Sequence, residues 1–240
     1  MVMRITLNIF FIVALLTGCS NTDDTVDKEA SVELLYNRAF SQLRSGTYGL
    51  AAKGFLEVDR QHPYSDWATK AQLMAAFCYY QSNKYDDAIL SLERFVRIHP
   101  SNSNVPYAFY LKAISYYEQI SDVGRDQKMT RLALKSLNEI LVRFPDSKYA
   151  RDSSLKIDLA RDHLAGKEME IGRYYERKGY YLAAINRYKQ VIEKFQTTTH
   201  VPEALHRLTG SYLAIGLKEQ ANKTASVLGH NFPGSDWYVD

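Results

Sequence analysis

The histidines and carboxylates are the side chains of this chain that could hold a metal or transfer a proton. The six histidines are His62, His99, His163, His200, His206 and His230. None belongs to the helical His-Glu-x-x-His pattern of zinc proteases, and no Gly-x-Ser-x-Gly elbow or phosphate-binding glycine loop is present. The sequence therefore predicts no enzyme, no metal site and no cofactor.

The cysteines offer a different chemistry at the beginning of the chain. One positive charge, Arg4, precedes an apolar run that ends at Leu16, the layout of a secretory signal and too short for a transmembrane helix. The following Thr17-Gly18-Cys19 completes a pattern that resembles the bacterial lipobox. That resemblance implies cleavage before Cys19, a diacylglyceryl thioether on its sulfur and a third acyl chain on its amine. The alternative is an ordinary signal with an incidental cysteine.

Three acyl chains hold a protein on a membrane far more firmly than one, since each buried CH₂ contributes roughly 0.8 kcal/mol. Ser20 stands where many bacteria use Asp to retain a lipoprotein at the inner membrane, which favours the periplasmic face of the outer membrane. We expect residues 1–18 to be the signal peptide and residues 19–31, polar and acidic, to be the lipidated cysteine with a tether. Cys78 has apolar neighbours and is expected in the core.

The charge balance excludes one class of partner. The chain has 30 basic and 27 acidic residues, a net charge of +3, and the two signs alternate along it. A nucleic-acid-binding protein would concentrate basic residues in a patch or stripe. We therefore expect no nucleic acid among its partners.

An internal repeat gives the strongest prediction of the fold. Five alanines are each followed, twelve residues later, by a helix-ending site. The alanines are Ala51, Ala88, Ala133, Ala184 and Ala221; the ending sites are Pro63, Pro100, Pro145, Gln196 and Pro233. Two residues further on lie candidate helix N-caps, namely Ser65, Asn102, Ser147, Thr198 and Ser235. Five copies in one phase predict a solenoid with a binding surface.

Each copy has the pattern of a helix pair. Gly46, Asn83 and Gly179 precede the alanine by five residues, where a left-handed turn would end the first helix, and a tyrosine then opens the second. The pattern Gly-x-Tyr-x-x-Ala-x-x-x-aromatic resembles the tetratricopeptide repeat. The predicted fold is all-α, a right-handed solenoid of about five tetratricopeptide-like helix pairs.

The ending sites are 37, 45, 51 and 37 residues apart, so the middle two spacings are much longer than the usual repeat of about 34 residues. The third copy carries an insertion that we place in the loop Ser121–Lys128. In the fourth, residues 147–179 have room for one long helix or for two helices broken near Gly166. We divide the solenoid into residues 32–122, with repeats 1 and 2 and the first helix of repeat 3, and residues 123–240, with the remainder.

Three stretches carry a more specific resemblance. They are Arg94–Pro100 continued through Asn104 and Tyr107 to Tyr110, then Phe144–Tyr149, and Leu159–Asn186. Together with the lipobox and the repeats they resemble the BamD family, lipoproteins of the outer-membrane β-barrel assembly machine (the BAM complex). The resemblance covers nearly the whole mature chain.

The resemblance implies a non-enzymatic scaffold whose partners are the POTRA domains of BamA, other lipoproteins of the complex and unfolded outer-membrane β-barrel proteins. The amino-terminal repeats would receive the terminal β-signal of substrates, and the carboxyl-terminal repeats would bind BamA. Carried over by position, the substrate-groove candidates are Tyr36, Phe40, Tyr48, Tyr64, Trp67, Tyr79 and Tyr80. The candidates for BamA binding are Arg187, Arg207, Tyr212 and Lys218.

Two departures and two alternatives accompany this interpretation. Some relatives place a basic residue where this chain has Leu213, and some have a longer loop at residues 121–128. A tetratricopeptide lipoprotein that serves peptidoglycan or cell-division proteins would share the fold and the lipobox.

At the carboxyl end, Pro233–Trp237 nearly repeats Pro63–Trp67, so Trp237 either packs on the fifth copy or contacts a partner.

The lipobox prediction has a direct test. Replacing Cys19 by Ser removes the sulfur that would carry the diacylglyceryl group, so the variant is expected to leave the membrane without unfolding. Fractionation of envelopes, with circular dichroism of the released chain, measures both effects. A Cys19→Ser variant that stays with outer membranes after its protein contacts are removed would contradict the anchor.

Overall fold

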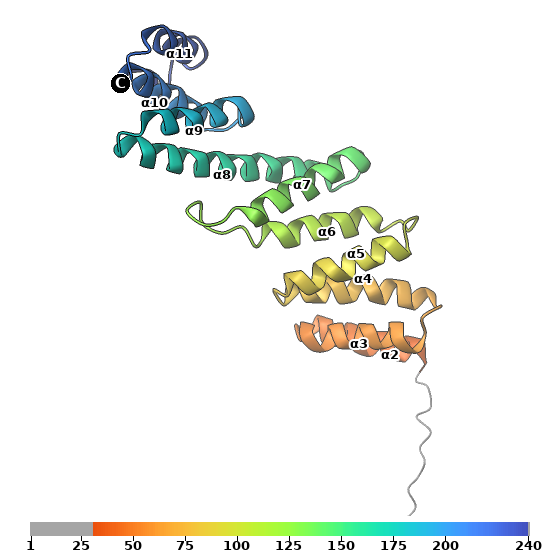
Figure 1. The fold of residues 1–240 in the computed structure, drawn as a ribbon. Helices are drawn as coiled ribbons and strands as arrows, with labels where there is room; N and C mark the ends of the chain where they lie inside the picture. Colours follow the sequence, from red (N-terminus) through yellow and green to blue (C-terminus); the bar gives the residue numbers. More distant parts are fainter. Residues whose placement is uncertain (1–30, 240) are drawn as a thin grey trace, which may run out of the picture.

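The computed structural model describes residues 31–239 as a series of helices joined by short turns (Figure 1). The predicted signal peptide, Cys19 and the tether to residue 30 lie outside the described residues. The helices are α2 (Val32–Arg44), α3 (Tyr48–Gln61), α4 (Asp66–Gln81), α5 (Tyr85–Ile98), α6 (Val105–Tyr117), α7 (Lys128–Arg143), α8 (Ala150–Arg177), α9 (Tyr181–Lys194), α10 (Val201–Ala214), α11 (Lys218–Asn231) and α12 (Asp236–Val239).

The helices form five consecutive pairs, from α2 with α3 to α10 with α11. Each helix packs mainly on the helices before and after it in the chain. Figure 1 shows the pairs following one another along an elongated molecule. The prediction of an all-α solenoid of about five helix pairs is therefore confirmed.

The repeated alanines lie in the buried face of the second helix of each pair. All five are buried, with at most 1% of their surface exposed. The large side chain four residues later is fully buried in the first four pairs, as Phe55, Leu92, Leu137 and Tyr188. In the fifth pair that position is Ala225, which is exposed. A small residue beside a large one lets the helices approach while filling the space between them.

Turn residues end the helices as predicted. Gly46, Asn83 and Gly179 have φ of 76°, 58° and 76°, and Gly216 adds a fourth left-handed turn with φ of 81°. A glycine reaches this region without a steric penalty, which explains its place after a first helix. Each second helix ends two residues before its predicted ending site, for example α3 at Gln61 before Pro63.

The predicted N-caps are wrong in three of the five copies. Ser65 caps α4, with its hydroxyl oxygen accepting from the Ala68 N–H at 3.0 Å, and the Ser235 hydroxyl accepts from the Trp237 N–H at 3.2 Å. The helices α6, α8 and α10 instead begin three residues after the predicted cap, because one extra turn of chain precedes each. Asn104, Tyr149 and His200 occupy their cap positions without a side-chain cap bond.

Three clusters of buried apolar side chains make the core. One joins α2, α3 and α4, the next extends from α4 to α8, and the last extends from α8 to α11. The helix α8 belongs to two of them: Ile157 packs in the middle cluster, whereas Ala165 and Met169 pack in the last. The segment before the fourth alanine is thus one continuous helix of 28 residues, with Gly166 buried inside it.

The carboxyl-terminal segment packs on the fifth pair. His206 Nδ1 donates to the carbonyl oxygen of Trp237 at 2.9 Å, and the Trp237 ring lies 5.5 Å from the Arg207 guanidinium. The short helix α12 therefore rests on α10. Tyr238 remains half exposed, so its contact with a partner stays a prediction.

Two helical glycines provide a matched test of the packing. A Cβ at Gly172 would overlap the Tyr188 ring, with Cδ1 2.9 Å away, whereas a Cβ at Gly210 would meet nothing within 4 Å. Gly172→Ala is expected to lower the free energy of unfolding by about 1–3 kcal/mol through overpacking. Gly210→Ala should raise it by about 0.5–1 kcal/mol, because alanine favours the helix. Urea denaturation measures both, and equal effects would contradict this packing.

Candidate functional site

The first helices of successive pairs, α2, α4, α6, α8 and α10, follow one another in a row and together form one surface. The helix α2 contacts α4, and α4 contacts α6. Side-chain bonds continue the row: Tyr110 on α6 reaches Asp152 on α8, and Arg173 on α8 reaches Glu203 on α10. Functional side chains from distant repeats can therefore lie on a single face.

An aromatic cluster occupies the amino-terminal end of this row. The Tyr36 ring lies 4.7 Å from Trp67 and 6.4 Å from Phe40, with which it stacks at 11°. Burial raises the pKa of Tyr36. Phe40 keeps 39% of its surface exposed, and Lys70 Nζ lies 5.1 Å from the Trp67 ring. We call Tyr36, Phe40 and Trp67 the N-terminal aromatic cluster; it offers a partly exposed apolar surface in which the Tyr36 and Phe40 rings are nearly parallel and the Trp67 ring is tilted by 55°.

The other substrate-groove candidates do not join this cluster. Tyr48 and Tyr79 pack against the core cluster of α2, α3 and α4. Tyr80 packs against the middle core cluster, with its ring 5.8 Å from the Tyr85 ring. Tyr64 lies in the turn between α3 and α4 and is fully exposed. The seven candidates therefore separate into one compact cluster and four scattered rings.

Sequence reasoning missed a second aromatic cluster in the middle of the row. The Tyr110 ring stacks on Tyr149 at 4.8 Å, and Tyr107 lies 5.8 Å from the same ring. The Tyr110 hydroxyl donates to Asp152 Oδ2 at 2.7 Å. Burial raises the pKa of Tyr107 to about 12. These rings come from the stretches Tyr107–Tyr110 and Phe144–Tyr149, which the sequence marked as family-like without assigning them a contact.

The loop between α6 and α7 is fastened to α8. Gln127 is 3% exposed, and its amide nitrogen donates to three backbone carbonyls of the loop. These carbonyls belong to Asp122, Val123 and Arg125. Gln127 Oε1 accepts from the Thr130 hydroxyl at 2.7 Å and lies 3.0 Å from His163 Nδ1 on α8. This buried amide holds the loop in one shape against the long helix.

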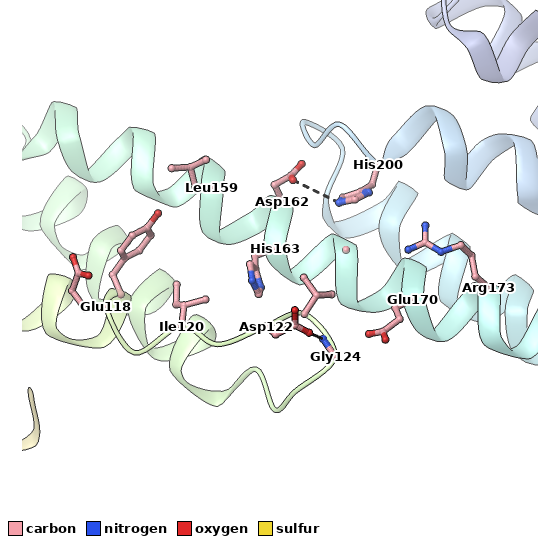
Figure 2. Close-up of a pocket in the computed structure, with 13 residues that line it drawn as sticks. Glu118, Ile120, Asp122, Gly124, Leu159, Asp162, His163, Glu170, Arg173 and His200 are labelled. Atoms are coloured by element: carbon pink, nitrogen blue, oxygen red, sulfur yellow. Dashed lines mark hydrogen bonds and ion pairs between the residues drawn. The ribbon is translucent and has the colours of Figure 1, made fainter.

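A pocket of about 740 Å³ opens between this loop and α8 (Figure 2). We call it the loop pocket. Its lining residues are Tyr117, Glu118, Ile120, Asp122, Val123, Gly124, Leu159, Asp162, His163, Gly166, Glu170, Arg173 and His200. His200 Nε2 lies 3.6 Å from Asp162 Oδ2, and this pair closes one side of the pocket. Sequence reasoning did not predict it, because its walls come from three separate segments.

Behind the pocket, an ion network ties α8 to α10. Arg173 Nη1 donates to both oxygens of Glu203 at 2.9 and 3.0 Å. Arg207 donates from Nε to Glu203 at 2.7 Å and from Nη1 to Glu176 at 3.1 Å. The Tyr188 hydroxyl also donates to Glu176, at 2.6 Å. Arg207 was predicted to contact BamA, yet the structure commits its guanidinium to internal partners.

The network changes the titration of Glu203. Burial raises the pKa of this carboxyl, but hydrogen bonds from Arg207 and Arg173 and their positive charges outweigh it, so the net pKa is below the ordinary value. The ionised form of Glu203 therefore stabilises the fold.

The remaining carboxyl-terminal candidates lie on different elements. Arg187 on α9 pairs with Glu168 at 2.9 Å and lines a second, open cavity of about 490 Å³ with Tyr175. Tyr212 packs against the last core cluster. Lys218 begins α11 and is exposed.

Two other kinds of chemical site could lie among the described residues, a metal site and a reactive thiol. Within residues 31–239 no three His, Cys, Asp or Glu side chains are grouped so as to hold a metal. Cys78 is fully buried, as predicted, and burial raises the pKa of its thiol to about 12. The helices of residues 31–239 include none long and apolar enough to cross a membrane.

Comparison with known proteins identifies the family. Residues 28–228 match the family described as outer membrane lipoprotein. The outer membrane protein assembly factor BamD of Caulobacter vibrioides is 48% identical over 98% of this chain and 78% of its own length. The factor of the same name from Rickettsia prowazekii is 46% identical over 93% of this chain and 89% of its own.

The chain belongs to the BamD family.

A BamD protein of Neisseria meningitidis is 36% identical over 92% of this chain and 88% of its own length. The resemblance stated from the three sequence stretches is therefore confirmed.

The BamD fold should respond to acid through Glu203. A carboxyl with a lowered folded pKa contributes stability above its unfolded pKa, near 4.5, and this contribution is lost as the pH falls through the folded value. Glu203→Gln is expected to cost about 2 kcal/mol at pH 7, the value of charged hydrogen bonds. The difference from the parent chain should shrink in acid.

Urea denaturation between pH 3 and pH 8 measures this difference. Glu219→Gln is the control, because Glu219 forms an exposed pair with Lys223 and should change stability little. A Glu203→Gln penalty that is independent of pH would contradict the assigned network.

Proposed function

We propose that this chain is a non-enzymatic scaffold of the outer-membrane β-barrel assembly machine, anchored by acyl chains on Cys19 at the periplasmic face of the outer membrane. The observation that carries the proposal is its similarity, over nearly its whole length, to proteins named outer membrane protein assembly factor BamD. The same observation argues against an adaptor for peptidoglycan or cell-division proteins.

Its amino-terminal end binds the terminal β-signal of unfolded barrel proteins. An extended segment that ends in an aromatic residue needs flat apolar contacts, and the N-terminal aromatic cluster offers stacked rings with Phe40 accessible. Of the seven candidates, Tyr36, Phe40 and Trp67 carry this role. The others contribute packing or more distant contacts.

Its carboxyl-terminal end binds the POTRA domains of BamA. Lys218 is exposed at the start of α11, and Arg187 lines an open cavity, so both can meet acidic groups of a partner. Arg207 pairs with Glu203 and Glu176, and Tyr212 packs against the last core cluster, so both act through the fold of this end. A substitution at Arg207 would disturb the Glu203 network and so cannot isolate a BamA contact.

A pull-down of the tagged chain from gently solubilised envelopes tests the complex. Mass spectrometry should find BamA in near-equal amount. Peptidoglycan or division proteins without BamA would overturn the proposal.

Two variants test the division of labour. Lys218→Glu is expected to reduce BamA capture, because it reverses an exposed charge, while Lys135→Glu on the exposed side of α7 makes the same change of net charge as a control. Phe40→Ala should keep BamA but weaken binding of a peptide with a terminal phenylalanine by about tenfold, as loss of an aromatic anchor does. Leu90→Ala, also exposed, is its control. The opposite ranking would contradict the assignment of the two ends.

A further inference from the structure

We propose that the loop pocket binds an extended peptide segment of a partner protein that presents a lysine or arginine flanked by apolar side chains. The pocket is distinct from the N-terminal aromatic cluster and from the surface around Lys218, so the inference does not rest on the function proposed for either end. Its support comes from shape, charge and apolar lining.

The pocket is already formed in the unbound chain. Gln127 fixes the loop through its buried amide, and Lys167 Nζ donates to the Gly124 carbonyl at 2.9 Å from the α8 side. Gly166 lets His200 and Val123 pack closely on the α8 wall, since a Cβ there would lie 3.2 Å from His200 Nε2 and 3.6 Å from Val123 Cγ1. A volume of about 740 Å³ is within the usual range for ligand sites, roughly 300–1,000 Å³. A partner segment would lose little free energy in reorganising it.

Carboxylates dominate the charge of the lining. The four acids are Glu118, Asp122, Asp162 and Glu170, and the one guanidinium is that of Arg173. Arg173 already donates to both oxygens of Glu203 outside the pocket. Glu118, Asp122 and Glu170 are exposed residues and can meet an incoming cation; Glu170 Oε2 also lies 3.5 Å from Lys167 Nζ, so Glu118 and Asp122 supply most of the attraction. Figure 2 shows Glu118 at one end of the lining and Glu170 near the other.

Apolar groups separate the acids and define the rest of the ligand. Tyr117, Ile120 and Val123 come from the end of α6 and the loop, and Leu159 on α8 keeps 59% of its surface exposed. A cationic head with an apolar stem or neighbours satisfies both kinds of wall, as lysine and arginine do. An acidic peptide would meet four like charges. The chain's own residues 20–30 contain Asp23, Asp24, Asp27 and Glu29 and have the wrong sign.

Fluorescence anisotropy of labelled peptides with the detergent-purified full chain tests the inference. The probe is a fluorescein-labelled Gly-Leu-Arg-Leu-Gly peptide, and its control carries citrulline, a neutral analogue of arginine with nearly the same shape. The arginine peptide is expected to saturate the chain and to bind roughly tenfold more tightly than the citrulline peptide, since a charge-assisted hydrogen bond is lost.

Two variants locate the site. Glu118→Gln with Glu170→Gln removes two exposed charges without removing volume, and it should lower affinity for the arginine peptide roughly tenfold while leaving citrulline binding unchanged. Glu33→Gln with Glu219→Gln alters the net charge equally at distant exposed positions and should have no effect.

Three results would overturn the inference. They are no saturable binding of the arginine peptide, equal binding of the arginine and citrulline peptides, and equal loss in the pocket variant and its distant control. The last result would indicate attraction to the overall charge of the chain rather than to this pocket.

Discussion

The continuity of α8 is the constraint on which the rest of the molecule depends. Its first half packs in the middle core cluster through Ile157, and its second half packs in the last cluster through Met169. In a solenoid each repeat contacts only its neighbours, so a helix shared by two cores transmits position between the two ends. The Tyr110–Asp152 bond and the Gln127 amide then fasten the preceding repeat and its loop to this helix.

The partly buried ion network between α8 and α10 fixes the relative placement of these two helices more than it adds to the free energy of unfolding. The Arg173, Glu203, Arg207 and Glu176 network takes charged groups partly out of water, which costs free energy unless every partner is placed well. Here Glu203 receives three hydrogen bonds from two guanidinium groups. The network therefore specifies how α10 lies on α8, and so how the surface around Lys218 is presented.

Much of the fold could be predicted because it follows from local rules. Ala51 and its four counterparts mark close helix contacts, and Gly46 and Gly179 mark turns that other residues rarely adopt. The predictions failed or stopped where several distant segments decide the outcome. Thr198 is of a residue type suited to an N-cap, but one extra turn of chain precedes α10. The sequence places Arg207 on a helix without indicating that Glu176 and Glu203 pair with it. The loop pocket draws its walls from segments about 80 residues apart, from Tyr117 to His200.

In the proposed function, one continuous solenoid holds a substrate at one end and BamA at the other. Site-specific photo-crosslinking in growing cells tests it most directly, with p-benzoylphenylalanine placed at Phe40 in one strain and at Lys218 in another. The account predicts that Phe40 captures unfolded outer-membrane proteins and that Lys218 captures BamA. Capture of BamA at Phe40, or of unfolded barrel proteins at Lys218, would contradict it.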